Sequence, residues 1–199
     1  KLNDMLDDMR YGKIMIVTDQ DRDGSHIKGL LINFLHFYWP ILIKKSDFVT
    51  CLQTPIVKCS KGREWVTFYN TVEYDKWKKD RSDIKKWKIK YYKGLGTSTS
   101  KEAKECFKNL NDKKMIMTIE DDSDEEAIIL AFKKDRANDR KRWIKKATGK
   151  EIYLDPSLKK INIKQFIDEE LVLFSIEDCE RSIPSMMDGL KPSQRKVLY

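Results

Sequence analysis

Three aspartates stand at alternate positions in residues 18–26, which read TDQDRDGSH. Asp19, Asp21 and Asp23 come directly after the apolar residues 14–17. Three carboxylates a few ångströms apart repel one another, so folding alone gives no reason to collect them. Carboxylate oxygens are ligands for divalent cations, and Mg²⁺ is commonly held by one or two carboxylates together with several waters. The pattern predicts a magnesium site, in which the third carboxylate could hold a second ion or its water.

Two other interpretations of this loop stand beside the magnesium site. The pattern D-x-D-x-D-G matches the start of a calcium-binding EF-hand, but position twelve is Leu30 instead of glutamate. A run typical of a strand also precedes the loop, where an EF-hand has a helix. A plain acidic turn that caps a helix at Ser25 would need only one aspartate. His26 is either a surface or core histidine or a functional residue of the same loop.

The segments on either side of the loop predict how it is positioned. Residues 13–18 are rich in Ile and Val and predict a short buried strand. Residues 25–44 predict a helix that Pro40 bends or interrupts. Strand, acidic loop and helix form an α/β unit, and such sheets bind ligands at the carboxyl ends of their strands. We expect one broad helix stripe to face the core, consisting of Ile27, Leu30, Leu31, Phe34, Leu35 and Tyr38.

The rest of the chain alternates further strands and helices. We expect strands over 49–60 and 64–69, joined by a hairpin turn at Lys61-Gly62, and a third strand over 85–92. Capping-box pairs, Thr99 with Glu102 and Ser123 with Glu126, predict helices over about 100–110 and up to residue 147. Further helices are expected over 71–79, over 163–174 and from Pro192 onward. Residues 148–158 read as a linker.

Composition limits the classes of protein and partner. The 199 residues carry a net charge of +8, which points to an acidic partner, nucleic acid first. The basic stretch 81–101 interleaves Trp87, Tyr91 and Tyr92 among its cations, as nucleic-acid surfaces often do. Four cysteines without CxxC spacing make a zinc site or a disulfide framework improbable. The chain shows neither an apolar run long enough for a membrane span nor a signal-peptide pattern at its start, so no membrane partner is expected.

Three segments together resemble the eukaryotic-type, fused type IIA DNA topoisomerase II. They are residues 10–34 (RYGKIMIVTDQDRDGSHIKGLLINF), 91–105 (YYKGLGTSTSKEAKE) and 181–199 (RSIPSMMDGLKPSQRKVLY). The first resembles the metal loop of a TOPRIM domain, the second a segment shared with gyrase B-type subunits. The third resembles the start of the gyrase A-type breakage-reunion region. The resemblance implies an α/β fold: a partial, Rossmann-like TOPRIM sheet, an α+β extension, and the start of a helical, winged-helix-type DNA-gate domain.

The resemblance also implies roles for residues of the loop and of the glycine-rich segment. Asp19 and Asp21 match the principal magnesium ligands, and Asp23 would serve a second metal position or its waters. Mn²⁺ or Ca²⁺ could substitute for Mg²⁺. The DNA-contacting positions expected in this part of the chain are His26, Lys93, Gly94 and Gly96. The two glycines would let the backbone approach a phosphate, and the helix N-terminus that follows attracts anions.

Four further positions match the family near the end of the chain. Arg181 matches an arginine that helps hold the scissile phosphate across the dimer, and Lys191, Arg195 and Lys196 match basic residues of the DNA gate. The family's nucleophilic tyrosine and one TOPRIM glutamate match no residue here, and no nucleotide-binding signature is visible. We therefore expect an internal piece of a larger enzyme that is inactive alone, with ATP used by a region of the parent outside this chain.

The expected parent is an ATP-dependent enzyme that cleaves both strands of double-stranded DNA through tyrosine transesterification, passes a second duplex and religates. It would be a homodimer with active sites shared in trans, located in the nucleus, or in the viral factories of the host cytoplasm if viral. Expected domains are 1–50 (TOPRIM with the metal loop), 51–150 (α+β extension), 151–162 (linker) and 163–199 (start of the breakage-reunion domain). The alternative is a stand-alone metal-dependent nucleic-acid-binding module, or another TOPRIM protein such as a primase or nuclease.

Overall fold

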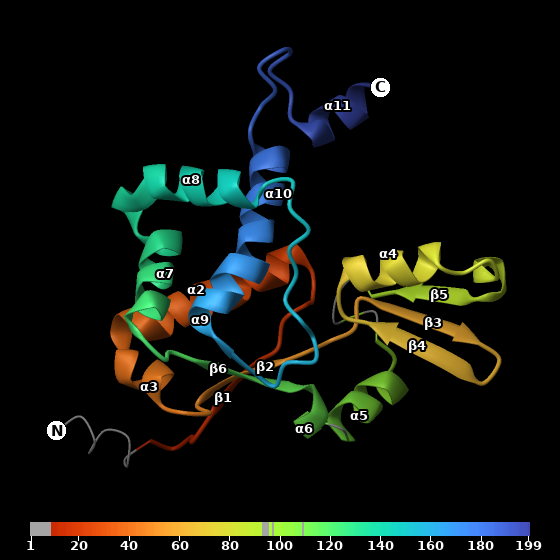
Figure 1. The fold of residues 1–199 in the computed structure, drawn as a ribbon, viewed down its shortest axis with the longest axis horizontal. Helices are drawn as coiled ribbons and strands as arrows, with labels where there is room; N and C mark the ends of the chain where they lie inside the picture. The colour runs from red at the N-terminus through yellow and green to blue at the C-terminus, as the bar shows by residue number, and fades with distance from the viewer. Residues whose placement is uncertain (1–8, 93–95, 97, 109) are drawn as a thin grey trace.

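A mixed four-stranded sheet lies at the centre of the larger part of the molecule (Figure 1). The computed structural model describes residues 9–92, 96, 98–108 and 110–199. The strand order is β1-β2-β6-β7, formed by β1 (Ile14–Ile16), β2 (Val49–Leu52), β6 (Lys114–Thr118) and β7 (Lys160–Asn162). The pairs β1–β2 and β6–β7 are parallel, and β2–β6 is antiparallel. Alternate residues of the inner strands therefore face the same side, where Val49 and Met117 are fully buried.

Helices pack over that side of the sheet, from α2 and α3 to α10 (Figure 1). Their bounds are α2 (Arg22–Tyr38), α3 (Pro40–Lys44), α7 (Asp122–Phe132), α9 (Ile163–Phe166), the π-helical turn η4 (Ile167–Leu171) and α10 (Val172–Ser182). Ile32 of α2 and Phe166 of α9 meet the strands in one apolar core. Helices α2 and α9, which are far apart in the sequence, are thereby packed together next to the acidic loop.

A second, three-stranded sheet stands beside the first and has its own core (Figure 1). Its order is β4-β3-β5, formed by β3 (Val57–Lys61), β4 (Glu64–Phe68) and β5 (Lys88–Tyr91), and α4 (Thr71–Lys79) packs against it. Phe68, Tyr74 and Trp87 are buried in this core. The other described elements are η1 (Ile84–Lys86), α5 (Ser100–Lys108), α6 (Leu110–Lys113), η3 (Lys134–Arg136), α8 (Ala137–Ala147) and α11 (Pro192–Leu198).

Helix α2 buries a different face from the predicted one. Ile32 and Leu35 are buried, together with the small or paired residues Ser25, Lys28 and Gly29. The predicted stripe is wrong in its other members: Ile27, Leu30, Leu31, Phe34 and Tyr38 are all between 42% and 58% exposed. The helix is apolar on two faces, so its periodicity does not determine which face packs against the sheet.

Several predicted boundaries also differ from the structure. The single strand expected over 49–60 is wrong, because β2 and β3 belong to different sheets. The helix expected to reach residue 147 breaks at Lys133, which has extended backbone angles. Arg140 donates to the carbonyl oxygens of Leu130 and Lys133 there, and so caps the end of α7. Strands β6 and β7 were not predicted.

Two further predictions, a helix cap and an exposed aromatic residue, differ from the structure. The cap of α7 is Asp121 paired with Asp124, where Ser123 and Glu126 were expected. Asp124 is buried because it also accepts the backbone N–H of Lys164 across the molecule, at 2.7 Å. Trp87 is 6% exposed and cannot serve as an open stacking platform for a base.

Candidate metal and phosphate site

The acidic loop leaves the carboxyl end of β1 and runs directly into α2. Asp21 is the N-cap of α2, and its Oδ1 accepts the backbone N–H of Gly24 at 2.8 Å. Aspartate is among the preferred N-cap residues because its carboxylate satisfies a backbone N–H that has no partner within the helix. Gly24 is required for close packing, because an added Cβ would lie 1.9 Å from the carbonyl oxygen of Asp19. The cap and the tight turn hold the aspartates at the end of the strand, as predicted.

Asp23 binds Arg181, a residue 158 positions later in the chain. The guanidinium donates from Nη2 to Oδ1 at 2.6 Å and from Nη1 to Oδ2 at 3.1 Å, which is a bidentate geometry. These hydrogen bonds lower the pKa of Asp23 and raise that of Arg181. Asp178, one turn earlier on α10, accepts from Nε of Arg181 at 3.3 Å and helps fix the side chain. The structure thus brings an arginine to the aspartate loop within one chain.

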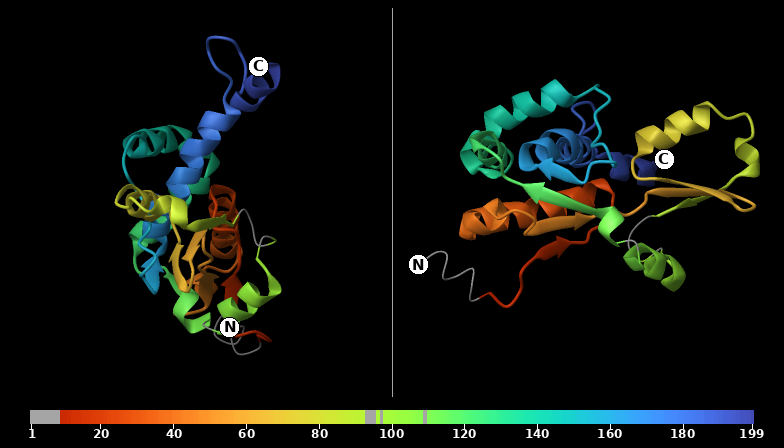
Figure 2. Two further views of the ribbon diagram at one scale, coloured as in Figure 1. Left: turned by 90° about the vertical axis from the view of Figure 1, so that its right-hand side faces the viewer. Right: turned by 60° about the horizontal axis from the view of Figure 1, so that its bottom comes forward.

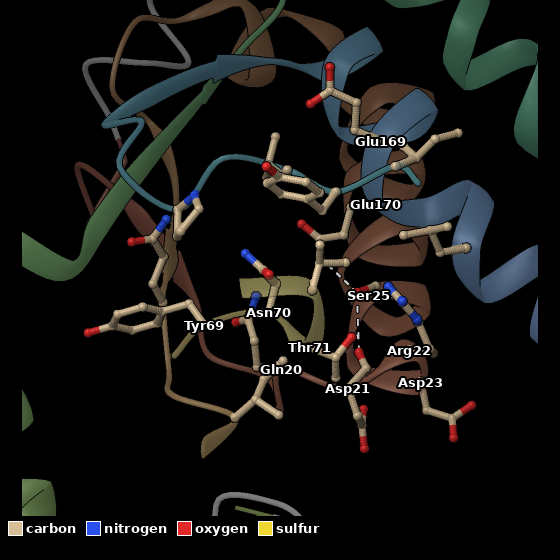
Figure 3. A pocket seen from close by; sticks show the side chains of 18 of the residues that line it. Gln20, Asp21, Arg22, Asp23, Ser25, Tyr69, Asn70, Thr71, Glu169 and Glu170 are labelled. Atoms are coloured by element: carbon tan, nitrogen blue, oxygen red, sulfur yellow. Dashed lines mark hydrogen bonds between the residues drawn. The ribbon is translucent and has the colours of Figure 1, made fainter. Parts of the chain in front are cut away.

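A buried ion pair joins α2, just after the acidic loop, to η4. Lys28 of α2 donates to Oε1 of Glu170 at 2.7 Å. Ser25 donates to the same oxygen at 2.7 Å (Figure 3). Both charged side chains are less than 10% exposed. Burial acts to lower the pKa of Lys28, but the adjacent Glu170 carboxylate outweighs it and the net shift is upward. Glu170 lies in the π-helical turn η4, a local distortion that is frequent at functional sites.

The loop lies between two cavities. One of about 430 Å³ is lined by Asp21, Asp23, Asn70, Tyr153 and Glu170, among others. Figure 3 shows Asn70 on one side of this cavity and Glu170 on the other. The other, of about 360 Å³, is lined by Asp19 together with Trp65, Cys106 and Phe107, among others. The first cavity is rich in carboxylates, and the second is more apolar. Gln20, between Asp19 and Asp21, lines both cavities, so the loop forms the wall between them.

The residues fit a loosely held cation better than a carboxylate cage. In the part of the chain that the structure describes, no three His, Cys, Asp or Glu side chains come together as a metal-binding group. Asp23 binds Arg181, and Asp19 and Asp21 are the other two carboxylates of the loop. Two carboxylates completed by water suffice for Mg²⁺. The donor set is therefore compatible with the predicted ion.

The predicted DNA-contacting residues fall into separate groups. Lys93 and Gly94 lie outside the described residues, and Gly96 is exposed with nothing within 4 Å of an added Cβ. His26 stacks on Phe174 of α10, with ring centroids 4.1 Å apart and planes 9° apart. This stacking anchors α10 to the start of α2 and gives His26 a packing role.

Residues 183–199 form an arm that extends beyond the end of α10 and carries α11 (Figures 1 and 2). Lys191 is the N-cap residue of α11, and its backbone N–H donates to Gln194 at 2.8 Å. Arg195 binds Asp188 of the same arm with two 2.7 Å contacts, and Lys196 is exposed. The basic residues of the arm therefore lie apart from the aspartate loop, and Arg181, next to the start of the arm, contacts Asp23 of the loop.

Glu102 is a residue of the site region whose full role the sequence did not reveal. The capping box with Thr99 is confirmed: Thr99 N donates to Oε2 at 2.8 Å, and Glu102 N donates to the Thr99 hydroxyl. The same carboxylate also accepts from Lys90 at 2.7 Å and from Tyr92 at 2.6 Å. Partial burial raises its pKa, but these hydrogen bonds outweigh that effect and lower the pKa of Glu102 to about 2. Glu102 therefore joins residues on both sides of the glycine-rich segment.

Comparisons with known proteins agree with this arrangement. A family model described as the C-terminal associated domain of TOPRIM matches residues 52–179. DNA topoisomerase 2-alpha of Rattus norvegicus is 51% identical over 207 residues, which cover 98% of this chain and 14% of that protein. DNA topoisomerase 2-beta of Gallus gallus is 49% identical over 205 residues, covering 98% of this chain and 12% of that protein. The chain thus spans a small part of the length of the relatives it matches.

A solved structure supports the fold. The DNA-binding, cleavage and re-ligation domain of Plasmodium falciparum topoisomerase II matches with a TM-score of 0.87 and 46% identity. The match covers 98% of this chain and 26% of that one. The predicted α/β fold with a partial TOPRIM sheet and the predicted resemblance are confirmed. Among the described residues, no helix is long and apolar enough to cross a membrane.

Proposed function

This chain belongs to the family of the C-terminal associated domain of TOPRIM, and from this premise we propose that it is part of an ATP-dependent type II DNA topoisomerase. The parent would cleave both strands of double-stranded DNA through a tyrosine, pass a second duplex and religate. The observation that carries the proposal is the meeting of Arg181 with the aspartate loop at the end of β1. A guanidinium suits a phosphate oxygen, and carboxylates suit the cation that a phosphate needs.

We infer that Asp19 and Asp21 hold the divalent cation, with Mg²⁺ as the ion. A bound Mg²⁺ would stabilise negative charge on the scissile phosphate and on the leaving oxygen. The chain's own contribution is to keep the carboxylates in place: Asp21 is fixed as a helix cap, and Gly24 keeps the turn close to Asp19. Arg181 would add a second positive centre for a scissile phosphate. Asp23 orients that guanidinium through both of its oxygens.

The basic residues would bind the DNA backbone around this centre. Lys93, Gly94 and Gly96 would approach a phosphate from the glycine-rich segment, whose neighbours Glu102 holds together. The arm would carry a second contact through Lys191, Arg195 and Lys196. Such contacts position the duplex and do not read its sequence. The proposal includes double-stranded DNA as the substrate and a homodimer with shared active sites as the active form. It also includes ATP used elsewhere in the parent and a nuclear location.

A chimera tests this function directly. The matching segment of rat topoisomerase 2-alpha would be replaced by these 199 residues, and relaxation of supercoiled DNA would be measured with Mg²⁺ and ATP. We expect the chimera to be active and its Asp21→Asn variant to lose about 100-fold or more in rate, because charge stabilisation at the phosphate is lost. Asparagine is as good an N-cap as aspartate, so the helix start should survive the change.

A matched control separates charge at the site from charge elsewhere. Asp121 is also an N-cap aspartate, on α7, and accepts the backbone N–H of Ser123 at 2.8 Å. The Asp121→Asn chimera should keep its activity. A folded chimera that cannot relax DNA, or equal activity of Asp21→Asn and Asp121→Asn, would contradict the proposal.

A further inference from the structure

The contact between Arg181 and Asp23 joins the acidic loop to the base of the arm. Arg181 is in the last turn of α10, which ends at Ser182, and the arm starts at the next residue. In the described part of the chain, arm residues hydrogen-bond only with one another and with the end of α10. The arm is largely open to solvent, with Met186 98% and Met187 89% exposed. Its orientation therefore depends on how the end of α10 is held.

Three contacts hold α10 against the start of α2, from Phe174 in its first turn to Arg181 in its last. The bidentate pair of Arg181 with Asp23 is the shortest of them, at 2.6 Å and 3.1 Å. Phe174 stacks on His26, and its ring also lies 5.7 Å from the guanidinium carbon of Arg181. The third contact, from Arg22 to Glu177, is 3.9 Å long. Among these, the pair of Arg181 and Asp23 is the one made by a carboxylate of the aspartate loop.

We propose that Arg181 is an internal counter-ion that competes with a divalent cation for Asp23, and that this competition couples cation binding to the position of the arm. The inference rests on the proposed function in one respect, which is that the aspartate loop binds a divalent cation, with Asp23 serving a second metal position or its waters beside Asp19 and Asp21. Both oxygens of Asp23 accept from the guanidinium, so a cation that approaches this carboxylate meets a fixed positive charge and binds more favourably once Arg181 has moved away. Asp178 still accepts from Arg181 and gives the released side chain a second partner on its own helix.

The coupling must act in both directions. A cation that displaces Arg181 weakens the attachment of the end of α10, and any event that pulls Arg181 away increases the affinity of the loop for the cation. Both Asp23 and Arg181 are partly exposed, at 58% and 44%, so the exchange needs no opening of the core. A salt bridge at the surface is weak enough for a cation to replace the arginine. Its bidentate geometry nevertheless fixes one orientation of the guanidinium.

The first measurement is Mn²⁺ binding by calorimetry to the chimera that carries these 199 residues within rat topoisomerase 2-alpha. Removing one positive charge a few ångströms from a divalent ion in a water-like dielectric should tighten binding about three- to tenfold in Arg181→Gln. Arg181→Lys keeps the charge without the planar fork and should fall between the two. The control is Arg136→Gln. Arg136 of η3 is a similarly paired arginine, and its Nη1 lies 2.7 Å from Oε1 of Glu126. That variant should bind Mn²⁺ like the wild type.

The second measurement is amide hydrogen exchange over residues 176–190, with and without Mn²⁺. In the wild type, Mn²⁺ should speed exchange at the end of α10, whereas in Arg181→Gln exchange should already be fast and insensitive to Mn²⁺. Equal Mn²⁺ affinity of wild type, Arg181→Gln and Arg136→Gln would overturn the competition and leave the metal site intact. Absence of Mn²⁺ binding in every folded variant would overturn both the competition and the metal site of the proposed function.

Discussion

Replacing Glu102 with glutamine should remove a specific, pH-dependent part of the stability of this protein. The Glu102 carboxylate accepts hydrogen bonds from Lys90, Tyr92 and Thr99, and these residues flank the glycine-rich segment on both sides. Glutamine has nearly the same shape but cannot carry the charge that these donors stabilise. The change therefore tests the electrostatic part of the network with little effect on packing.

The size of the effect follows from the pKa of Glu102. Burial opposes ionisation, yet the hydrogen bonds lower the pKa from 4.5 to about 2 in the folded protein. At ~1.4 kcal/mol for each pH unit, this difference corresponds to at most about 3 kcal/mol. The Lys90 side chain is 37% exposed, so solvent screening reduces the value to about 1–2 kcal/mol. Because the folded pKa is depressed, this stability is fully present above pH 4.5 and is lost as the pH falls through about 2.

Urea unfolding of both proteins as a function of pH measures this contribution. At neutral pH, Glu102→Gln should be less stable than the wild type by about 1–2 kcal/mol, and near pH 2 the difference should fall below about 0.5 kcal/mol. Glu64→Gln, at an exposed position of β4, is the control and should show no such pH-dependent difference. A difference between Glu102→Gln and the wild type that is constant across the pH range, or absent, would refute the reasoning.

Two further changes test the loop and its support. Lys28→Met should lower the free energy of unfolding by about 3–5 kcal/mol, because it leaves the buried Glu170 carboxylate without its cation; urea unfolding measures this, and a loss below about 1 kcal/mol would show that the pair is dispensable. Gly24→Ala should destabilise the fold by about 1–3 kcal/mol and weaken Mn²⁺ binding, because its Cβ would clash with the Asp19 carbonyl. Gly12→Ala, with open space around the added Cβ, is the matched control, and equal stability and Mn²⁺ affinity of the two variants would contradict the role assigned to Gly24.

Local features of the site region were readable from the sequence. The order of strand, acidic loop and helix is confirmed, and α4 has the predicted bounds Thr71–Lys79. The capping box of Thr99 and Glu102 is confirmed as well. Each of these depends on residues a few positions apart, whose hydrogen bonds and periodicity act within one turn or one strand. The second capping prediction failed because two overlapping acidic patterns, at 121–124 and 123–126, compete at the start of α7.

Other features depend on which distant surfaces meet. The buried face of α2 follows from the sheet and from α9, because both Ile32 and Phe34 lie on apolar faces and only contact with a partner distinguishes them. Residues 49–60 divide between two sheets because β2 pairs with β6 and β3 pairs with β4 and β5. Short strands such as β7 carry too few residues for a periodic signal and exist through their pairing.

The sequence by itself determined that three aspartates and a glycine follow a strand, and hence where a cation could bind. The tertiary structure decided what each aspartate does: Asp21 caps the helix, whereas Asp23 binds Arg181 from a helix 158 residues away. No local pattern marks that pair, because it forms when η4 and α10 pack against α2 through the core and the buried pair of Lys28 and Glu170. Electrostatic partners across such a distance are set by the packing of the whole chain.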